Sequence, residues 1–476
     1  MATLKLGWDK KSITPIGEIC KKVSLLGQFY ERITDVVRDP IYATALAIES
    51  EDGTKSVIIS LDLSIIPEQL INETRKKLKA LAPDFPPEAL IMAATHVHTG
   101  PHIKRDFLSD LWGYRFNATP EDPEVLTPEA FSDFVSDKAA LAASEAWKNR
   151  APGGVAAGFG RVAVPQCRRV CYKDGSAQMY GPTDTDRFLR IEGGADTGVE
   201  YLFTFDADKK LTGAVINLAC PAQILEHKYY ITADLWGEVC RQWPECPNIL
   251  PLCGAAGDIT MRDLVRQGKA EQDMHSEEGM VQQAGRIVRE SRYVISEIRP
   301  EDILYDIPIK YVRRFVSLPL RRVSEEEYNM AKTIYDAFER EYEANDFTKE
   351  YEDSVQLRMR DRTTYAQAAG IVKRYQLQSE TSFVDMEIHT LRLGDLALAT
   401  NPFELYQDYA MQIKARSPAR QTIISQLSCG SLVYLPTELG IEGGSYSTYV
   451  SDGYVGPEGG RMLVEKTLDM LQNLYR

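Results

Sequence analysis

The chain has 476 residues, a formal net charge of −14 from 55 Lys+Arg and 69 Asp+Glu, and 44% hydrophobic residues. This length and composition are typical of a globular protein that buries its core without disulfides or metal staples, and no stretch reaches the roughly 18 apolar residues of a membrane span. The acidic balance, with no basic run, argues against nucleic acid and against stable membrane association.

Cellular location and thiol chemistry are indicated by two further features. Residues 1–8, MATLKLGW, lack the long apolar run of a signal peptide, so we expect a cytoplasmic protein. The eight cysteines contain no Cys-x-x-Cys pair and lie in apolar segments. That pattern favours reduced core thiols over zinc or redox cysteines.

The first predicted elements form a crossover unit. Lys55–Leu63 (KSVIISLDL) is an apolar strand, Pro67–Leu81 has apolar residues at helical spacing, and Ala89–Ala94 (ALIMAA) is a second strand. Strand, helix, strand in this order favours parallel pairing in an α/β layer. Ligand groups in such sheets gather beyond the carboxyl ends of the strands, where the histidines after Ala94 lie.

The rest of the chain predicts more sheet and one helical excursion. Apolar runs at 201–205, 213–218 and 248–252 end in Gly-, Pro- or Asp-bearing turns and are typical of strands. Residues 324–378 are rich in Glu, Lys, Arg, Tyr and Ala, which predicts two or three surface helices. Sheet follows at 385–398 and an amphipathic helix at 459–474. With no linker or repeat, the sequence favours one domain over residues 1–476.

Three of the six histidines fall within residues 95–102, THVHTGPH. In extended backbone His96 and His98 point to the same side, so both imidazoles can reach one centre, as metal ligands do. The alternative is a polar loop whose histidines hydrogen-bond each other or the main chain. The position after a buried strand favours a functional site.

Four other segments combine polar residues with turns after apolar strands. Residues 220–234 contain Glu226 and His227, and residues 253–260 (CGAAGDIT) form a small-residue turn that could bring backbone N–H groups close to a ligand. Residues 401–404 (NPFE) and 443–446 (GGSY) follow apolar or Pro-bearing segments. Each has an ordinary structural interpretation as well, such as a packing turn or a helix N-terminus.

Taken in order, these segments resemble the N-terminal catalytic region of the neutral/alkaline ceramidase family. The family's His-Thr-His-Ser-Gly-Pro is similar to residues 96–101, and its Gly-Asp-(aliphatic)-Ser turn to residues 257–260. Its Pro-Gly-Glu-Pro-Phe is similar to residues 401–404, and its Gly-Tyr-x-x-Tyr-x-Pro-Thr to residues 430–437. The resemblance implies an α/β ceramidase-like catalytic domain with mixed and parallel sheets, without the C-terminal immunoglobulin-like module of longer ceramidases.

The resemblance also implies a zinc enzyme that hydrolyses amides, with one metal ion held by two histidines, a glutamate and a tyrosine. By motif, His96, Glu404 and Tyr446 correspond to metal ligands. His98 resembles a non-ligand histidine that assists the reacting carbonyl or the water. The remaining candidates are substrate-binding Arg168, Asp258 and Tyr454, and catalytic Thr260 and Tyr449.

This chain departs from the family pattern at the second imidazole. Where relatives carry a ligand histidine after the Asn-x-Ala-Cys strand, the sequence has Pro221. We expect His227 to replace it, because a zinc site short of nitrogen ligands binds weakly or selects a harder metal. Thr260 replaces the family's serine, and as a covalent nucleophile it would need an activating base that the sequence does not locate.

The sequence therefore predicts a metal-dependent hydrolase, most simply a zinc enzyme acting on an amide or ester bond of a small soluble substrate through a metal-activated water. Two alternatives stay open. The same metal could serve a carbohydrate hydrolase or lyase, since fold kinship does not fix the reaction class. The chain could also be a non-catalytic metal- or ligand-binding relative.

Overall fold

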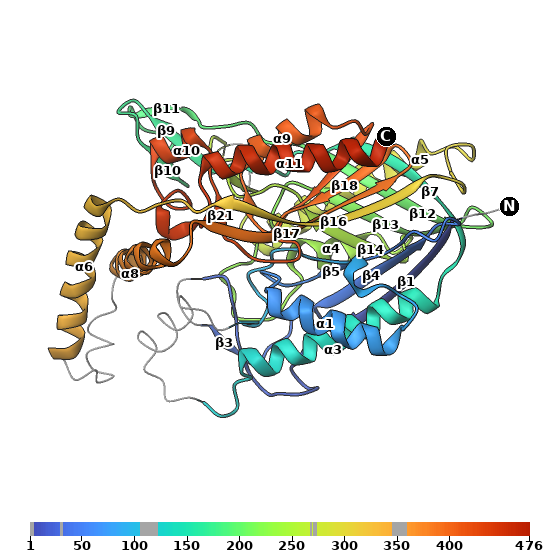
Figure 1. Ribbon diagram of the computed structural model, residues 1–476, viewed down its shortest axis with the longest axis horizontal. Helices are drawn as coiled ribbons and strands as arrows, with labels where there is room; N and C mark the ends of the chain where they lie inside the picture. The colour runs from blue at the N-terminus through green and yellow to red at the C-terminus, as the bar shows by residue number, and fades with distance from the viewer. Residues whose placement is uncertain (1–3, 29–31, 105–121, 267–268, 270–273, 345–358) are drawn as a thin grey trace.

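The computed structural model describes the whole chain except residues 1–3, 29–31, 105–121, 267–268, 270–273 and 345–358. An eight-stranded sheet and a four-stranded sheet form its centre. Helices α1 (Glu68–Leu81) and α3 (Pro128–Lys148) cover one side, and α9 (Gln407–Arg416) and α11 (Pro457–Tyr475) cover the other (Figure 1). The fold is a mixed α/β architecture, as the sequence predicts.

The eight-stranded sheet is mostly antiparallel, with parallel pairing only at its two edges. The strand order is β14 (Ile249–Cys253), β13 (Leu211–Leu218), β12 (Gly198–Asp206), β7 (Ala151–Arg161), β1 (Lys5–Ser12), β4 (Tyr42–Glu49), β5 (Lys55–Leu61), β6 (Leu90–Ala94). The sheet curls, so that β14 also lies against β4, β5 and β6. One contact across this curl is the hydrogen bond that the Ser60 hydroxyl on β5 donates to the Pro251 carbonyl on β14 at 2.5 Å.

The predicted crossover unit is confirmed at one edge of this sheet. Strands β5 and β6 pair in parallel, with Leu61 opposite Ala94, and α1 connects them. The carboxyl ends of both strands therefore meet, which brings residues 62–64 beside residues 95–98. Helix α3 packs on α1, β1 and β4, while α4 (Asp234–Gln242) and α5 (Glu277–Ser296) pack on each other.

The four-stranded sheet carries the C-terminal part of the candidate site. Its order is β16 (Ile309–Pro319), β17 (Phe383–Leu393), β18 (Leu396–Thr400) and β20 (Gln421–Ser425). The predicted sheet segment at 385–398 is a hairpin of two strands, because Gly394, with φ +63, turns the chain. The Asn217 amide joins the two sheets by donating to the carbonyls of Leu252 and Ile424, both at 2.9 Å.

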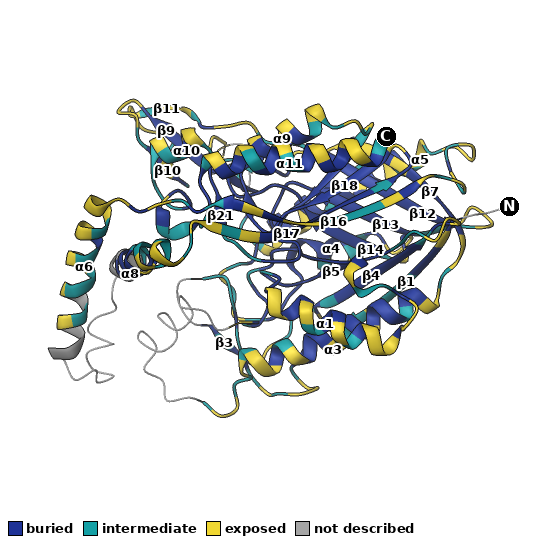
Figure 2. Cartoon of the chain, viewed as in Figure 1, coloured by how far each residue is buried: buried dark blue, intermediate teal, exposed yellow. Residues whose placement is uncertain are grey.

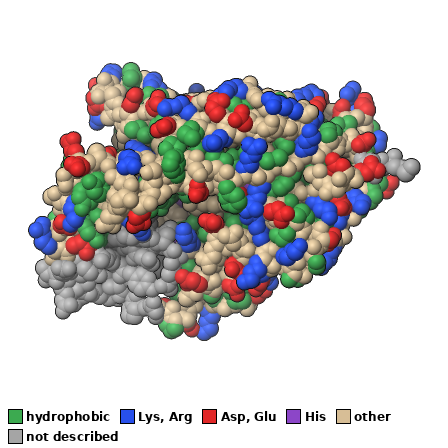
Figure 3. Space-filling model, in the orientation of Figure 1, with side chains coloured by type: hydrophobic (Ala, Val, Ile, Leu, Met, Phe, Trp, Pro, Cys, Tyr) green, Lys and Arg blue, Asp and Glu red, His purple; other side chains and the backbone are tan. Residues whose placement is uncertain are grey.

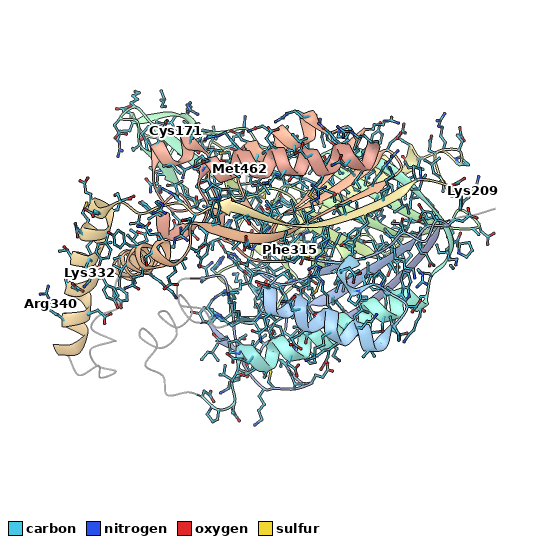
Figure 4. All side chains as sticks on the ribbon, in the orientation of Figure 1. Cys171, Lys209, Phe315, Lys332, Arg340 and Met462 are labelled. Atoms are coloured by element: carbon cyan, nitrogen blue, oxygen red, sulfur yellow. The ribbon has the colours of Figure 1, made fainter. Side chains whose placement is uncertain are left out.

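The predicted helical excursion is present as a pair of helices, α6 (Glu325–Ala344) and α8 (Met359–Glu380), which pack against each other. Figure 1 shows α6 projecting at one end of the molecule. Its side chains Lys332 and Arg340 extend away from the helix axis (Figure 4), and Lys332 forms an ion pair with Asp336 one turn on. Charged residues at this spacing are typical of a solvated helix.

Three pairs of short strands lie in loops that follow strands of the two sheets. They pair as β2 (Val23–Ser24) with β3 (Ile33–Thr34), β8 (Gln166–Cys167) with β15 (Ile259–Thr260), and β19 (Glu404–Leu405) with β21 (Tyr434–Leu435). A three-stranded sheet contains β10 (Ala177–Met179), β9 (Arg169–Tyr172) and β11 (Phe188–Ile191), next to α10 (Glu438–Gly443).

Burial follows the layers. Most strands of the two sheets are buried, although β16 at the edge of the four-stranded sheet is largely accessible, and exposed residues lie on the outward faces of the covering helices (Figure 2). The eight cysteines are free thiols, six of them buried, in agreement with the sequence. Acidic and basic side chains are interspersed over the face drawn in Figure 3. None of the described helices has the length and apolar character needed to cross a bilayer.

Candidate active site

The histidine block lies where the carboxyl ends of β5 and β6 meet. The Thr95 N–H donates to the Leu61 carbonyl at 3.0 Å, and the His96 N–H donates to the Leu63 carbonyl at 2.9 Å. His96 has φ +64, in the left-handed region. The expectation that this segment is extended is therefore wrong at His96, because a residue in the left-handed region turns the chain. The rings of His96 and His98 still meet edge to face, with centroids 4.9 Å apart.

The ring of His96 is fixed between a carbonyl and a carboxylate. Its Nδ1 lies 2.7 Å from the Ser64 carbonyl oxygen, and its Nε2 lies 3.2 Å from Oε2 of Glu404. A carbonyl only accepts hydrogen bonds, so Nδ1 carries the proton. In the neutral ring, Nε2 then directs a lone pair at the Glu404 oxygen. Two acceptors at this separation require a cation between them, either a proton or a metal ion.

Glu404 reaches this position from the four-stranded sheet. It follows β18 through residues 401–403, and its N–H donates to the Val433 carbonyl at 2.7 Å. Burial alone would raise the pKa of its carboxyl, but His96 and Arg168 outweigh burial and hold that pKa below its usual range. Glu404 is therefore an ionised acceptor at the centre of the site.

Tyr434 lies at the candidate site, although the sequence analysis gave it no role. It pairs directly with Glu404 in the parallel register of β19 and β21, so both side chains leave on one face, and its hydroxyl hydrogen-bonds the Glu404 carboxylate. Tyr446, the tyrosine expected as a ligand, lies beside it, with the two hydroxyl oxygens 3.4 Å apart. The GxxxY spacing in residues 430–434 was the available sequence signal.

Arg168 brings a buried positive charge to the same group. Its Nη2 donates to the Tyr434 hydroxyl at 3.2 Å and to the Gly257 carbonyl at 2.9 Å. The loop that carries Gly257 approaches so closely that a Cβ there would lie 2.4 Å from the Glu404 carbonyl oxygen. Only glycine allows that approach. The structure thus places Arg168 beside Tyr434 and the loop that meets Glu404.

Asp258 and Thr260, two further predicted site residues, lie near Arg168. The Asp258 carboxylate accepts the N–H of Gln407, the first residue of α9, at 2.9 Å, and burial raises its pKa to about 7. The Thr260 hydroxyl accepts from the Tyr180 hydroxyl at 3.4 Å and lies 3.5 Å from the sulfur of Met261. Among the described residues, no imidazole or carboxylate hydrogen-bonds this hydroxyl, so a base for a threonine nucleophile is not found there.

Tyr449 and Tyr454 lie outside the gathered group. The Tyr449 side chain is 40% exposed at the start of a short 3₁₀ turn, Val450–Asp452. The Tyr454 ring packs under the guanidinium of Arg374 on α8, 4.6 Å from ring centroid to carbon. In the described structure no contact joins either ring to Glu404, so the catalytic role expected for Tyr449 and the substrate-binding role expected for Tyr454 lack support from the geometry.

The placement of His227 does not support its expected role as the second imidazole. His227 is exposed, whereas its neighbour Glu226 turns inward. The Asp234 carboxylate accepts the N–H groups of Ile224 and Leu225 at 3.1 and 2.7 Å, which fixes the loop with residues 223 and 226 facing the histidine block. From this segment the site therefore receives an amide and a carboxylate, and no imidazole.

These two side chains hold His98. Its Nδ1 lies 3.1 Å from Oε2 of Glu226, and its Nε2 lies 2.8 Å from Nε2 of Gln223. Burial lowers the pKa of His98, against the opposing effect of Glu226. His98 therefore has a partner at each ring nitrogen and lies next to His96, and burial favours its neutral form.

A second cluster, not anticipated from the sequence, joins α1 to the four-stranded sheet. Ligand atoms of Glu387, His389 and Cys429 lie within 4.8 Å of one another, as a metal site would require. However, the guanidinium groups of Arg75 and Arg313 both pair with the Glu387 carboxylate. Two cations already balance that charge, so the contacts favour a buried ion cluster over a metal site.

The fold belongs to a recognisable structural class, that of ceramidase-like α/β proteins. The crystal structure of neutral ceramidase from Pseudomonas aeruginosa superposes with a TM-score of 0.69 over 100% of this chain and 75% of its own, at 16% identity. A second structure, a ceramidase complexed with C2, superposes with a TM-score of 0.69 over 100% of this chain and 76% of its own, at 15% identity. No protein-family model and no curated protein sequence matches the chain.

Proposed function

We propose that this chain is a metal-dependent hydrolase that cleaves an amide or ester bond in a small substrate, with zinc as its metal. One observation carries the proposal: the Nε2 of His96 faces the carboxylate of Glu404 at 3.2 Å while Nδ1 is committed to a carbonyl. The separation of two ligand atoms bound at about 2.0 Å in a tetrahedral zinc site is of this size. The ceramidase-like fold supports the same class of reaction.

The available donor atoms fit a divalent metal, but they include one histidine where the family resemblance implied two. His96 would supply nitrogen, Glu404 a carboxylate oxygen and Tyr434 a phenol oxygen, with Tyr446 next to it. Burial raises the phenol pKa of both tyrosines, so each would bind as a neutral phenol unless a nearby cation stabilised its phenolate. One imidazole with oxygen ligands is compatible with zinc and also with harder metals such as manganese.

When bound, a divalent ion supplies a Lewis acid and lowers the pKa of coordinated water toward about 7. The chain's own groups have defined parts around it. Arg168 directs positive charge at Glu404 and the two tyrosines, where it can orient an oxygen of the substrate. His98 is the adjacent neutral imidazole, able to hold or move a proton at Nε2.

The first test is elemental analysis of purified protein, combined with hydrolysis assays on N-acyl amines and simple esters. We expect about one divalent metal per chain and turnover of at least one compound class. His96→Ala should lose the metal. His227→Ala is the matched control and should keep it, because His227 is exposed.

Three results would contradict this assignment. Metal-free protein, or metal loss in His227→Ala, would refute the proposed ligand set. Metal without turnover on amides or esters, but with turnover of uronates or keto-sugars, would favour the carbohydrate-active alternative. Metal without turnover on any of these classes would favour a non-catalytic binding protein.

The two tyrosines give a second prediction. Tyr434→Phe is expected to weaken metal binding on the order of 10- to 100-fold, because this hydroxyl contacts Glu404 directly. Tyr446→Phe should have a smaller effect, since its hydroxyl meets that of Tyr434. Competition with a chelator measures both affinities. The reverse order would identify Tyr446 as the ligand.

A further inference from the structure

Glu226 contacts His98 in the way that an orienting carboxylate contacts a functional imidazole. The two side chains remain 21% and 16% exposed, so the pair is not sealed in the core. An ionised carboxylate only accepts hydrogen bonds, and the pKa of Glu226 is held low, at about 2, by His98 against the effect of burial. The Nδ1 of His98 must therefore carry the proton that bridges the 3.1 Å to Glu226.

The second ring nitrogen is then left as an acceptor. With the proton on Nδ1, the Nε2 of neutral His98 has a lone pair, and the Gln223 amide donates to it at 2.8 Å. Gln223 is buried, and its loop is tied to the histidine block by the Ala222 N–H, which donates to the Thr95 carbonyl at 3.3 Å. A substrate or water that uses Nε2 must take the place of this amide.

The backbones that carry the pair are fastened by one buried guanidinium. Nη1 of Arg32 donates to the carbonyls of Glu226 and Lys228 at 2.6 and 2.9 Å. Its Nη2 donates to the carbonyls of Leu26 and His98 at 2.9 and 2.5 Å. Arg32 is fully buried. Arg32 therefore links the loop that carries Glu226 to the loop that carries His98 and fixes the distance between them.

The backbone of Gly27 packs closely against the His98 side chain. Its φ is +114, and a Cβ there would lie 2.4 Å from Cβ and Cγ of His98. The chain thus uses a glycine to let this backbone approach the imidazole. The guanidinium and the glycine thus restrict the position of His98, while the carboxylate and the amide contact its two ring nitrogens.

We propose that Glu226 is a positioning residue that fixes His98 in the tautomer with the proton on Nδ1, so that Nε2 is the atom presented for proton transfer. This inference rests on the proposed hydrolytic function for its purpose, but the tautomer itself does not depend on that function. Glu226 acts through His98 and does not touch the reacting atoms. An imidazole oriented in this way keeps Nε2 as its acceptor nitrogen, which becomes available once a substrate or water displaces the Gln223 amide.

The test compares Glu226→Leu with the conservative Glu226→Gln. Selective ¹⁵N labelling of the six histidines, with His98→Asn for assignment, reports the protonated ring nitrogen by NMR in the metal-free and metal-bound protein. We expect Nδ1–H in the wild type and in Glu226→Gln, whose amide oxygen can still accept. Glu226→Leu should shift the proton toward Nε2, because the Gln223 amide can then accept through its oxygen.

Kinetics provide the second readout. On a substrate identified as above, Glu226→Leu should lower kcat on the order of 10- to 100-fold with KM within about twofold, and Glu226→Gln should restore part of the loss. An Nε2–H tautomer in the wild type, or an unchanged tautomer in Glu226→Leu, would overturn the positioning role. If no substrate is turned over while the tautomer shifts as expected, the proposed function fails and the positioning role stands.

Discussion

Replacing Glu404 with glutamine is expected to remove the metal and to lower turnover by about 10²- to 10³-fold, equivalent to several kcal/mol of lost Lewis-acid stabilisation. The amide has the shape of the carboxylate but carries no charge. Its N–H can donate directly to Nε2 of His96, which lies 3.2 Å from the present oxygen. The two facing acceptors then no longer require a cation between them.

The same substitution makes a distinctive prediction about stability. The free energy of unfolding of metal-free Glu404→Gln should lie within about 1 kcal/mol of that of metal-free wild type, because the amide donates a hydrogen bond to Nε2 of His96 in place of the proton that bridges the two acceptors when the metal is absent. Urea titrations of both chelator-treated proteins, alongside elemental analysis, measure this. A variant that keeps its metal would show that no metal ion bridges His96 and Glu404. A metal-free variant destabilised by several kcal/mol would show that the amide does not replace the bridging proton.

Glu387→Gln is expected to cost about 3–5 kcal/mol of unfolding free energy, the usual result of breaking a buried ion pair from one side. Burial opposes ionisation of Glu387, but His389, Arg75 and Arg313 all hydrogen-bond its carboxylate and hold its pKa well below the usual range. The variant leaves the Arg75 guanidinium buried without its counter-ion. Its remaining bonds, to the carbonyls of Pro87 and Leu90, do not neutralise the charge.

A matched control is available on the surface. Glu465→Gln breaks an ion pair with Arg416 in which both side chains are about half exposed, and should leave stability nearly unchanged because solvent screens the pair. Urea denaturation measures both variants, and their metal content separates two explanations of the cluster. If Glu387→Gln loses metal, then Glu387, His389 and Cys429 form a metal site and the ion-cluster interpretation is wrong.

The parts of the fold that the sequence predicted are those with strong local patterns. The crossover of β5, α1 and β6 was predicted because its apolar runs and helical spacing are continuous, and its parallel pairing follows from the length of the connection. Strand β7 was not predicted. Its sequence, APGGVAAGFGR, has little β propensity, and it is a strand because β12 pairs with it along its length.

Local reasoning was least successful for residues whose role depends on backbone direction. The left-handed turn at His96 could not be read from a polar run, and it changed where the neighbouring side chains point. The same limit applied to the 220–234 loop. There the bonds to Asp234 turn Glu226 inward and leave His227 exposed, although both residues have the polarity of a ligand.

The sequence by itself determined that this is an α/β protein with a histidine block at the end of a buried strand and a carboxylate after another strand. Residue identity and periodicity suffice for that, because they act within one element at a time. Only the tertiary structure decided that Glu404 meets His96, that Tyr434 joins them, and that Glu226 and Gln223 hold His98. These partners are more than 120 residues apart in three of the four pairs, and loop backbones that pair across elements, rather than local preferences, set which atoms face each other.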